Sequence, residues 1–95
     1  GLVGSEMCIR DRRKQGDEAE HLLNHPSFKS VINNLVETSF QTFVNTKPEE
    51  GAARERTYQH YRALVDVTNT LHQRVAVRDE ILAQQNDARD NNGEE

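Results

Sequence analysis

Apolar residues recur at three- and four-residue spacing in two stretches of the chain. In the first, residues 28–45, the apolar positions are Phe28, Val31, Ile32, Leu35, Val36, Phe40, Phe43 and Val44. This spacing is typical of an amphipathic helix. A strand is the competing interpretation because β-branched and aromatic residues are frequent here, but adjacent apolar pairs break the period of two. We therefore predict a helix over residues 28–45.

The second stretch predicts a longer helix, from about residue 49 to about residue 86. A heptad seam runs along it and consists of Tyr61, Leu64, Thr68, Leu71 and Val75. The next seam position holds Arg78, a charge where the pattern requires an apolar side chain. Apolar residues return at Ile81 and Leu82. The stripe either resumes after one gap or the core ends near Val75, and the pattern does not decide between these alternatives.

Proline and glycine positions predict where the helices begin and end. Asp17 is suited to cap a short helix over residues 17–24. His25 precedes Pro26, which disfavours helical backbone at residue 25 and favours a new helix beginning at the proline. Gly16 is a helix breaker in the polar segment over residues 13–17, so we predict a linker there or a frayed remnant of a longer helix. A second break at Pro48 separates the two long amphipathic helices by a short turn.

A short turn between amphipathic helices favours an antiparallel helical hairpin. At about 1.5 Å per residue, the helix over 49–86 would span roughly 55 Å and the helix over 28–45 roughly 27 Å. The overhang predicts an apolar stripe that only a partner covers: a second copy, another protein, or a missing N-terminal part of this chain. The alternative is a solvated, rather polar helix end. The predicted partner interface is Tyr61, Leu64, Leu71, Val75, Ile81 and Leu82.

Residues 1–12 show neither a helical period nor strand alternation. Back-translated, residues 2–11 resemble a transposon adapter used in sequencing libraries, which implies that they are not native and that the coding sequence was cut at its 5′ end. The alternative is a genuine disordered arm. We thus predict an adapter-derived or disordered arm over 1–16, a helical hairpin domain over 17–86 and a disordered polar tail over 87–95.

Composition narrows the class of protein. The chain has 95 residues, enough for one domain, and its 12 basic and 16 acidic residues give a formal net charge of −4. This acidic balance argues against general binding to nucleic acid or anionic membranes. The single cysteine, Cys8, excludes an intramolecular disulfide and favours a reducing compartment, and no apolar run approaches the roughly 20 residues of a membrane span. We expect an intracellular, cytoplasmic protein.

Candidate chemistry is sparse. His21 and His25 have a spacing that can present two metal ligands on one helix face, but the break at Pro26 argues against a shared face. His60 and His72 are too far apart along one helix to converge on a single ion. No catalytic triad order, phosphate-binding glycine loop or paired carboxylates in an apolar setting are evident. We expect no metal, no cofactor and no enzymatic activity.

One segment mixes basic and aromatic side chains: Arg54, Arg56, Tyr58 and Arg62. This composition suits contacts with bases and phosphates, and a small nucleic-acid-associated regulator is therefore the alternative function. We favour the interpretation in which the tyrosines pack across the hairpin and the arginines pair with acids of the neighbouring helix.

The order of these features has a counterpart among phage proteins. Ala19, Leu22-Leu23-Asn24, Pro26 and Phe28, then a helix, an acidic break and Arg54-Glu55-Arg56 before Tyr58 at the start of a long helix, resemble small uncharacterised helical proteins of tailed bacteriophages. The resemblance covers residues 19–83. It implies a phage origin, a role in virion assembly or in modulating another protein, and a location in the host cytoplasm or the virion. The expected function is a non-catalytic helical interaction protein that self-associates or docks on a larger partner.

Overall fold

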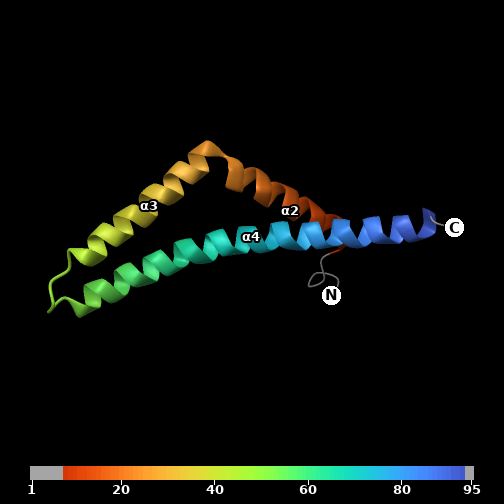
Figure 1. Cartoon of the computed structure of the whole chain (residues 1–95). Helices are drawn as coiled ribbons and strands as arrows, with labels where there is room; N and C mark the ends of the chain where they lie inside the picture. Colours follow the sequence, from red (N-terminus) through yellow and green to blue (C-terminus); the bar gives the residue numbers. More distant parts are fainter. Residues whose placement is uncertain (1–7, 94–95) are drawn as a thin grey trace. The chain divides into compact units, whose positions relative to one another are not determined.

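The computed structural model describes residues 8–93, and within them the side chains of residues 8–88. These residues form three helices and no strand: α2 (Ile9–Asn24), α3 (Pro26–Val44) and α4 (Gly51–Gly93). Figure 1 shows them along the chain. The predicted all-α fold is therefore confirmed. No helix in this part of the chain combines the length and apolar character that crossing a membrane requires.

The helix breaks lie where proline predicts them. His25 has extended backbone, with φ −74° and ψ 123°, and Pro26 begins α3. The Nδ1 atom of His25 accepts a hydrogen bond from the backbone N–H of Ser27 at 3.1 Å, so this histidine serves as the N-cap of α3. The second break is the loop over residues 45–50, which contains Pro48 and connects Val44 at the end of α3 to Gly51 at the start of α4.

Two boundaries differ from the prediction. α2 begins at Ile9, so of the two alternatives for residues 13–17 the longer helix is present, and Gly16 lies inside it. Residues 9–16 are helical where we predicted an arm. α4 continues to Gly93, so residues 87–93 are helical where we predicted a disordered tail. That polar segment contains no proline, and only its last residue is a glycine, so nothing in it interrupts the helix. Residues 1–7 and 94–95 lie outside the described residues.

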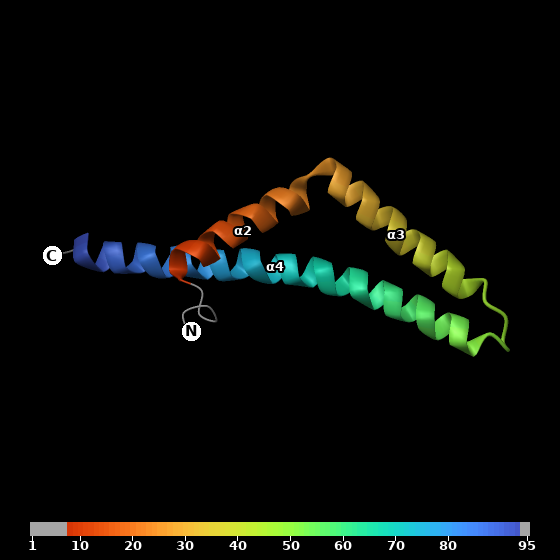
Figure 2. The ribbon, with the colours of Figure 1, turned by 180° about the vertical axis from the view of Figure 1, so that it is seen from behind.

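The chain forms two compact units, where the sequence predicted one domain over 17–86. In the terminal unit, made of residues up to Leu22 and from Leu71 onward, α2 meets α4 near Arg74 and Arg78, and α4 continues beyond the start of α2 (Figure 1, Figure 2). Its core is small, and the buried hydrophobic residues are Ala19 and Ile81. Gly16 is also buried, which shows how closely α2 approaches α4.

In the central unit, residues 23–70, α3 and the first part of α4 lie side by side and are joined by the loop over residues 45–50 (Figure 2). Two residues of the predicted heptad seam, Leu64 and Thr68, are half-buried here, whereas a third, Tyr61, is exposed. The other half-buried residues of α4 in this unit are Ala53, Arg54, Thr57 and Val65. Thr68 occupies its polar seam position without an unsatisfied hydroxyl, because its Oγ1 donates to the carbonyl oxygen of Leu64 at 3.0 Å.

Candidate interaction surface

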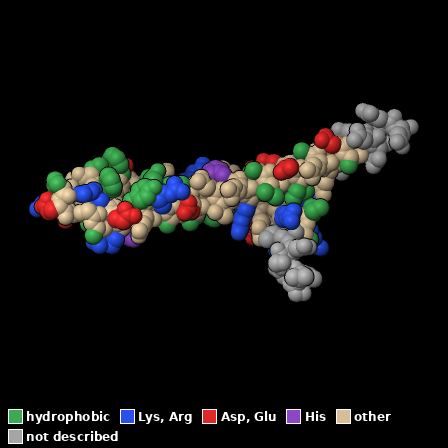
Figure 3. All heavy atoms as spheres, turned by 90° about the horizontal axis from the view of Figure 1, so that it is seen from below, with side chains coloured by type: hydrophobic (Ala, Val, Ile, Leu, Met, Phe, Trp, Pro, Cys, Tyr) green, Lys and Arg blue, Asp and Glu red, His purple; other side chains and the backbone are tan. Residues whose placement is uncertain are grey.

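The apolar stripe of α3 is wider than one neighbouring helix covers. Residues 23–70 are all described, and none of them is buried. Eight large hydrophobic side chains of this unit are exposed: Val31, Leu35, Phe40, Phe43, Val44, Tyr58, Tyr61 and Val67. Hydrophobic side chains reach the surface among charged ones on the face seen in Figure 3. The central unit thus has a helix seam but no enclosed core.

Four aromatic side chains gather on one side of this seam, and we call them the aromatic groove: Phe40, Phe43, Tyr58 and Tyr61. Together with Val36 and Thr57 they line a hollow of about 430 Å³ between α3 and α4. Their exposed fractions are 57% and 42% for the two phenylalanines and 49% and 40% for the two tyrosines. Glu37 and Ser39 also line the hollow. The groove therefore presents an open aromatic surface that includes polar side chains.

A second hollow, of about 280 Å³, also lies between α3 and α4. Leu35 and Val67 line it together with smaller or polar side chains, among them Ser39 and His60. It contains no phenyl or phenol ring. The aromatic groove is larger than this hollow and larger than a third one, of about 300 Å³, which Ile32, Leu64 and Val65 line.

The loop that joins α3 to α4 is held by Arg54. Its Nη1 donates to the carbonyl oxygen of Lys47 at 2.6 Å, and its Nη2 donates to that of Pro48 at 3.1 Å. The carboxylate of Glu50 accepts a hydrogen bond from the backbone N–H of Lys47 at 2.7 Å. Charge-assisted bonds of this kind are stronger than those between neutral groups. The loop is thereby fixed on α4, which positions the end of α3 and its phenylalanines beside the tyrosines.

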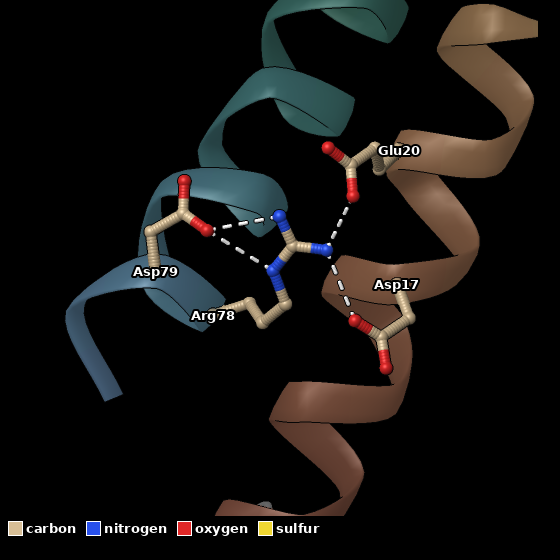
Figure 4. Close-up of polar contacts among 4 residues, drawn as sticks. All are labelled: Asp17, Glu20, Arg78 and Asp79. Atoms are coloured by element: carbon tan, nitrogen blue, oxygen red, sulfur yellow. Dashed lines mark hydrogen bonds and ion pairs between the residues drawn. The ribbon is translucent and has the colours of Figure 1, made fainter. Parts of the chain in front are cut away.

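In the terminal unit, Arg78 forms the centre of a cluster of charges (Figure 4). Its Nη1 lies 2.7 Å from a carboxylate oxygen of Glu20 and 3.0 Å from one of Asp17, both on α2. Its Nη2 lies 2.9 Å from Asp79 on α4. Only 12% of the Arg78 side chain is exposed, whereas about half or more of each carboxylate side chain is. Arg78 thus joins two helices by ion pairs at the edge of their contact.

These contacts explain how a charge occupies a seam position. The hydrogen bonds to Glu20, Asp17 and Asp79 raise the pKa of the Arg78 guanidinium above its ordinary value, so it remains charged wherever the chain folds. Its aliphatic stem covers Gly16, while its head reaches the acids of α2. Of the two alternatives that the sequence left open, the apolar stripe resumes after Arg78, because Ile81 is buried and Leu82 half-buried.

The predicted interface residues divide between the two units. Tyr61 is exposed in the aromatic groove, whereas Leu64 is half-buried in the seam. Leu71, Val75 and Leu82 are half-buried in the terminal unit, and Ile81 is only 9% exposed. We expected Val75, Val77, Ile81 and Leu82 to stay at least partly exposed, and this is wrong for Ile81 alone: Val77 is 40% exposed, and Val75 and Leu82 are half-buried. Ile81 lies in the terminal unit with α2, which begins eight residues earlier than predicted and is about 12 Å longer.

The residues of the alternative nucleic-acid segment have other roles or are dispersed. Arg54 is half-buried and holds the loop. Arg62 pairs with Asp66 one turn further along α4, with 3.2 Å between Nη2 and the carboxylate. Arg56 is exposed, and Tyr58 lies in the aromatic groove. The tyrosines line the groove with residues of α3, while Arg54 and Arg62 bond within the loop and α4 and not to acids of the neighbouring helix.

Three side chains of the groove, Phe40, Phe43 and Tyr58, were not among the predicted interface residues, and Tyr58 was assigned only to the alternative nucleic-acid contact. The available signal for the two phenylalanines was the width of the apolar stripe over residues 28–45, which exceeds what one helix covers. Among the described residues, no group of three or more His, Cys, Asp or Glu side chains is arranged to hold a metal ion. No known protein family, curated protein or solved structure matches this chain.

Proposed function

We propose that this chain is a non-catalytic helical interaction protein, and that the aromatic groove of its central unit is the surface that another protein chain covers. The observation that carries the proposal is that residues 23–70 contain eight exposed large hydrophobic side chains and no buried one. A pair of helices with such a surface lacks the enclosed core on which a stable domain depends. Contact with a further helical surface would supply that core.

The size of the surface supports the proposal. A fully exposed Phe or Tyr offers about 200 Å², so the exposed fractions of the four groove residues add up to roughly 400 Å². This lies within the range of about 300 to 600 Å² of the largest hydrophobic patches of monomeric proteins, which are often functional. At about 25 cal/mol per Å², covering it is worth about 10 kcal/mol before the entropy cost of association.

The finer features of the proposal come from the sequence. The short loop between α3 and α4 favours an antiparallel hairpin as the unit that docks. The resemblance to small phage proteins favours a phage-encoded component of a virion assembly. Nucleic-acid binding by Arg54, Arg56, Tyr58 and Arg62 is not proposed, because no feature of the structure favours it and Arg54 is engaged by the loop.

The proposal is tested by measuring whether the groove of the purified chain, residues 1–95, is open or covered by protein. An environment-sensitive dye such as anilinonaphthalene sulfonate is titrated into the chain, and its mass is determined under the same conditions. A monomer should bind the dye, and Phe40→Ser should weaken that binding while the matched variant Val77→Ser, at an exposed valine of the terminal unit, leaves it unchanged. A monomer that binds no dye would refute the proposal.

A further inference from the structure

Resting on the proposed function, we infer that the partner of the aromatic groove is a second copy of this chain, and that two central units pair through their grooves into a four-helix bundle. The groove lies between two helices, and two such pairs placed face to face make the arrangement of a four-helix bundle. A two-fold axis would place the same patch of both copies at the contact.

The area of the groove matches what a stable dimer needs. A specific interface of ordinary size buries about 800 Å² per partner, of which about 57% is non-polar, or roughly 450 Å². The four groove side chains alone expose roughly 400 Å². Val44, which is 52% exposed at the end of α3, and half-buried Val36 add to this surface. One groove therefore provides the hydrophobic part of one side of a standard interface.

The charges of the central unit also favour its own copy. Residues 23–70 contain five basic and five acidic residues, so the formal net charge of the unit is zero, whereas the whole chain has −4. Two such units approach each other without net repulsion, and near-zero net charge promotes association. Side chains of both charges lie in or near the groove: Glu37 lines it, and Arg62 is one helical turn beyond Tyr58. A strongly charged partner would find no complementary field of one sign here.

The experiment is sedimentation equilibrium of the 95-residue chain at about 1 to 100 μM. We expect a concentration-dependent transition from 10.9 kDa to twice that mass. Phe40→Glu on α3 and Tyr58→Glu on α4 should each raise the dissociation constant at least about 30-fold, as loss of a central aromatic contact does. Val77→Glu, at a valine that is 40% exposed in the terminal unit, is the matched control and should leave the dissociation constant unchanged.

Hydrogen exchange of the unaltered chain keeps the inference testable if a variant loses helicity. Amides of residues 36–43 and 57–61 should exchange more slowly at 100 μM than at 1 μM, and those of residues 9–22 should not change. A chain that stays monomeric, or a dimer that both groove variants leave intact, would overturn the inference. A monomer that binds the dye would leave the proposed function in place and refute only the second copy, whereas a monomer that binds no dye refutes both.

Discussion

The contact between α2 and α4 depends on the absence of a side chain at Gly16. A Cβ placed on this residue would lie far inside van der Waals distance of the Arg78 Cβ and 2.8 Å from the carbonyl oxygen of Arg74. The Arg78 Cβ and the Arg74 carbonyl belong to or adjoin the α4 backbone, so neither moves aside as the end of a flexible side chain would. Gly16→Ala therefore forces the two helices apart.

The expected magnitude is the difference between two opposing effects. Alanine in a helix interior is more favourable than glycine by about 1 kcal/mol. Inserting a methyl group into a tight contact costs about 1 to 3 kcal/mol, and separating the helices also exposes Ala19 and Ile81, of which the isoleucine alone contributes about 1.5 to 3 kcal/mol when buried. We expect Gly16→Ala to lower the free energy of unfolding by about 1.5 to 5 kcal/mol.

The assay is thermal and urea unfolding followed by circular dichroism at fixed protein concentration, with hydrogen exchange of residues 9–22 to locate the effect. For a chain of this size, each kcal/mol shifts the melting temperature by about 4 to 8 °C. Gly51→Ala is the matched control. A Cβ at Gly51 would meet only the Arg54 Nη2 atom, at 3.7 Å, which is an ordinary contact, so this variant should be neutral or slightly stabilising.

Helix propensity alone predicts that Gly16→Ala melts at the same temperature as the unaltered chain or higher, and that outcome would contradict the close contact at Gly16. That result would mean that α2 does not lie against α4 at Gly16. Loss of exchange protection in residues 9–22 of this variant, with unchanged protection in residues 36–43, would instead support the contact.

Three further changes test other features of the fold. Ile81→Ala should cost about 2 to 4 kcal/mol by denaturant unfolding because Ile81 is buried, whereas Val77→Ala, at an exposed valine, should cost less than about 1 kcal/mol; equal effects would contradict the assignment of Ile81 to the core. The ion pairs raise the pKa of the Arg78 guanidinium, so its stabilising charge is fully present below the ordinary guanidinium pKa and is lost only as the pH rises beyond it. A lysine at this position loses its proton above about pH 10, so Arg78→Lys should become less stable than the unaltered chain as the pH rises through that value. Melting temperatures of the two chains that stay parallel from about pH 8 to 11 would argue against the ion pairs. His25→Ala removes the side chain that caps α3 through Ser27 and should cost about 0.5 to 1 kcal/mol in thermal unfolding, with His25→Asn restoring most of the loss; an unaffected alanine variant would show that this cap does not contribute.

The heptad spacing of α4 predicts which residues lie in the seam but not which residues of other helices they contact. The positions of Leu64, Leu71 and Val75 in the seam follow from the 3.5-residue repeat, and the structure leaves each of them half-buried. The repeat could not reveal that Arg78 occupies its seam position through acids of another helix, because ion pairs between residues about 60 positions apart depend on how α2 packs.

The helical character of the chain and the positions of its breaks follow from local sequence, because the hydrophobic period and the steric effects of Pro26 and Pro48 act within a few residues. The beginning of α2 and the hydrophobic surface that stays uncovered depend instead on how the helices pack. Gly16 is a helix breaker by propensity, but a close approach to α4 needs a residue without a side chain, and that contact outweighs a cost of about 1 kcal/mol. The longer α2 that results from this contact covers Ile81, while the aromatic residues of α3 and of the first part of α4 stay exposed.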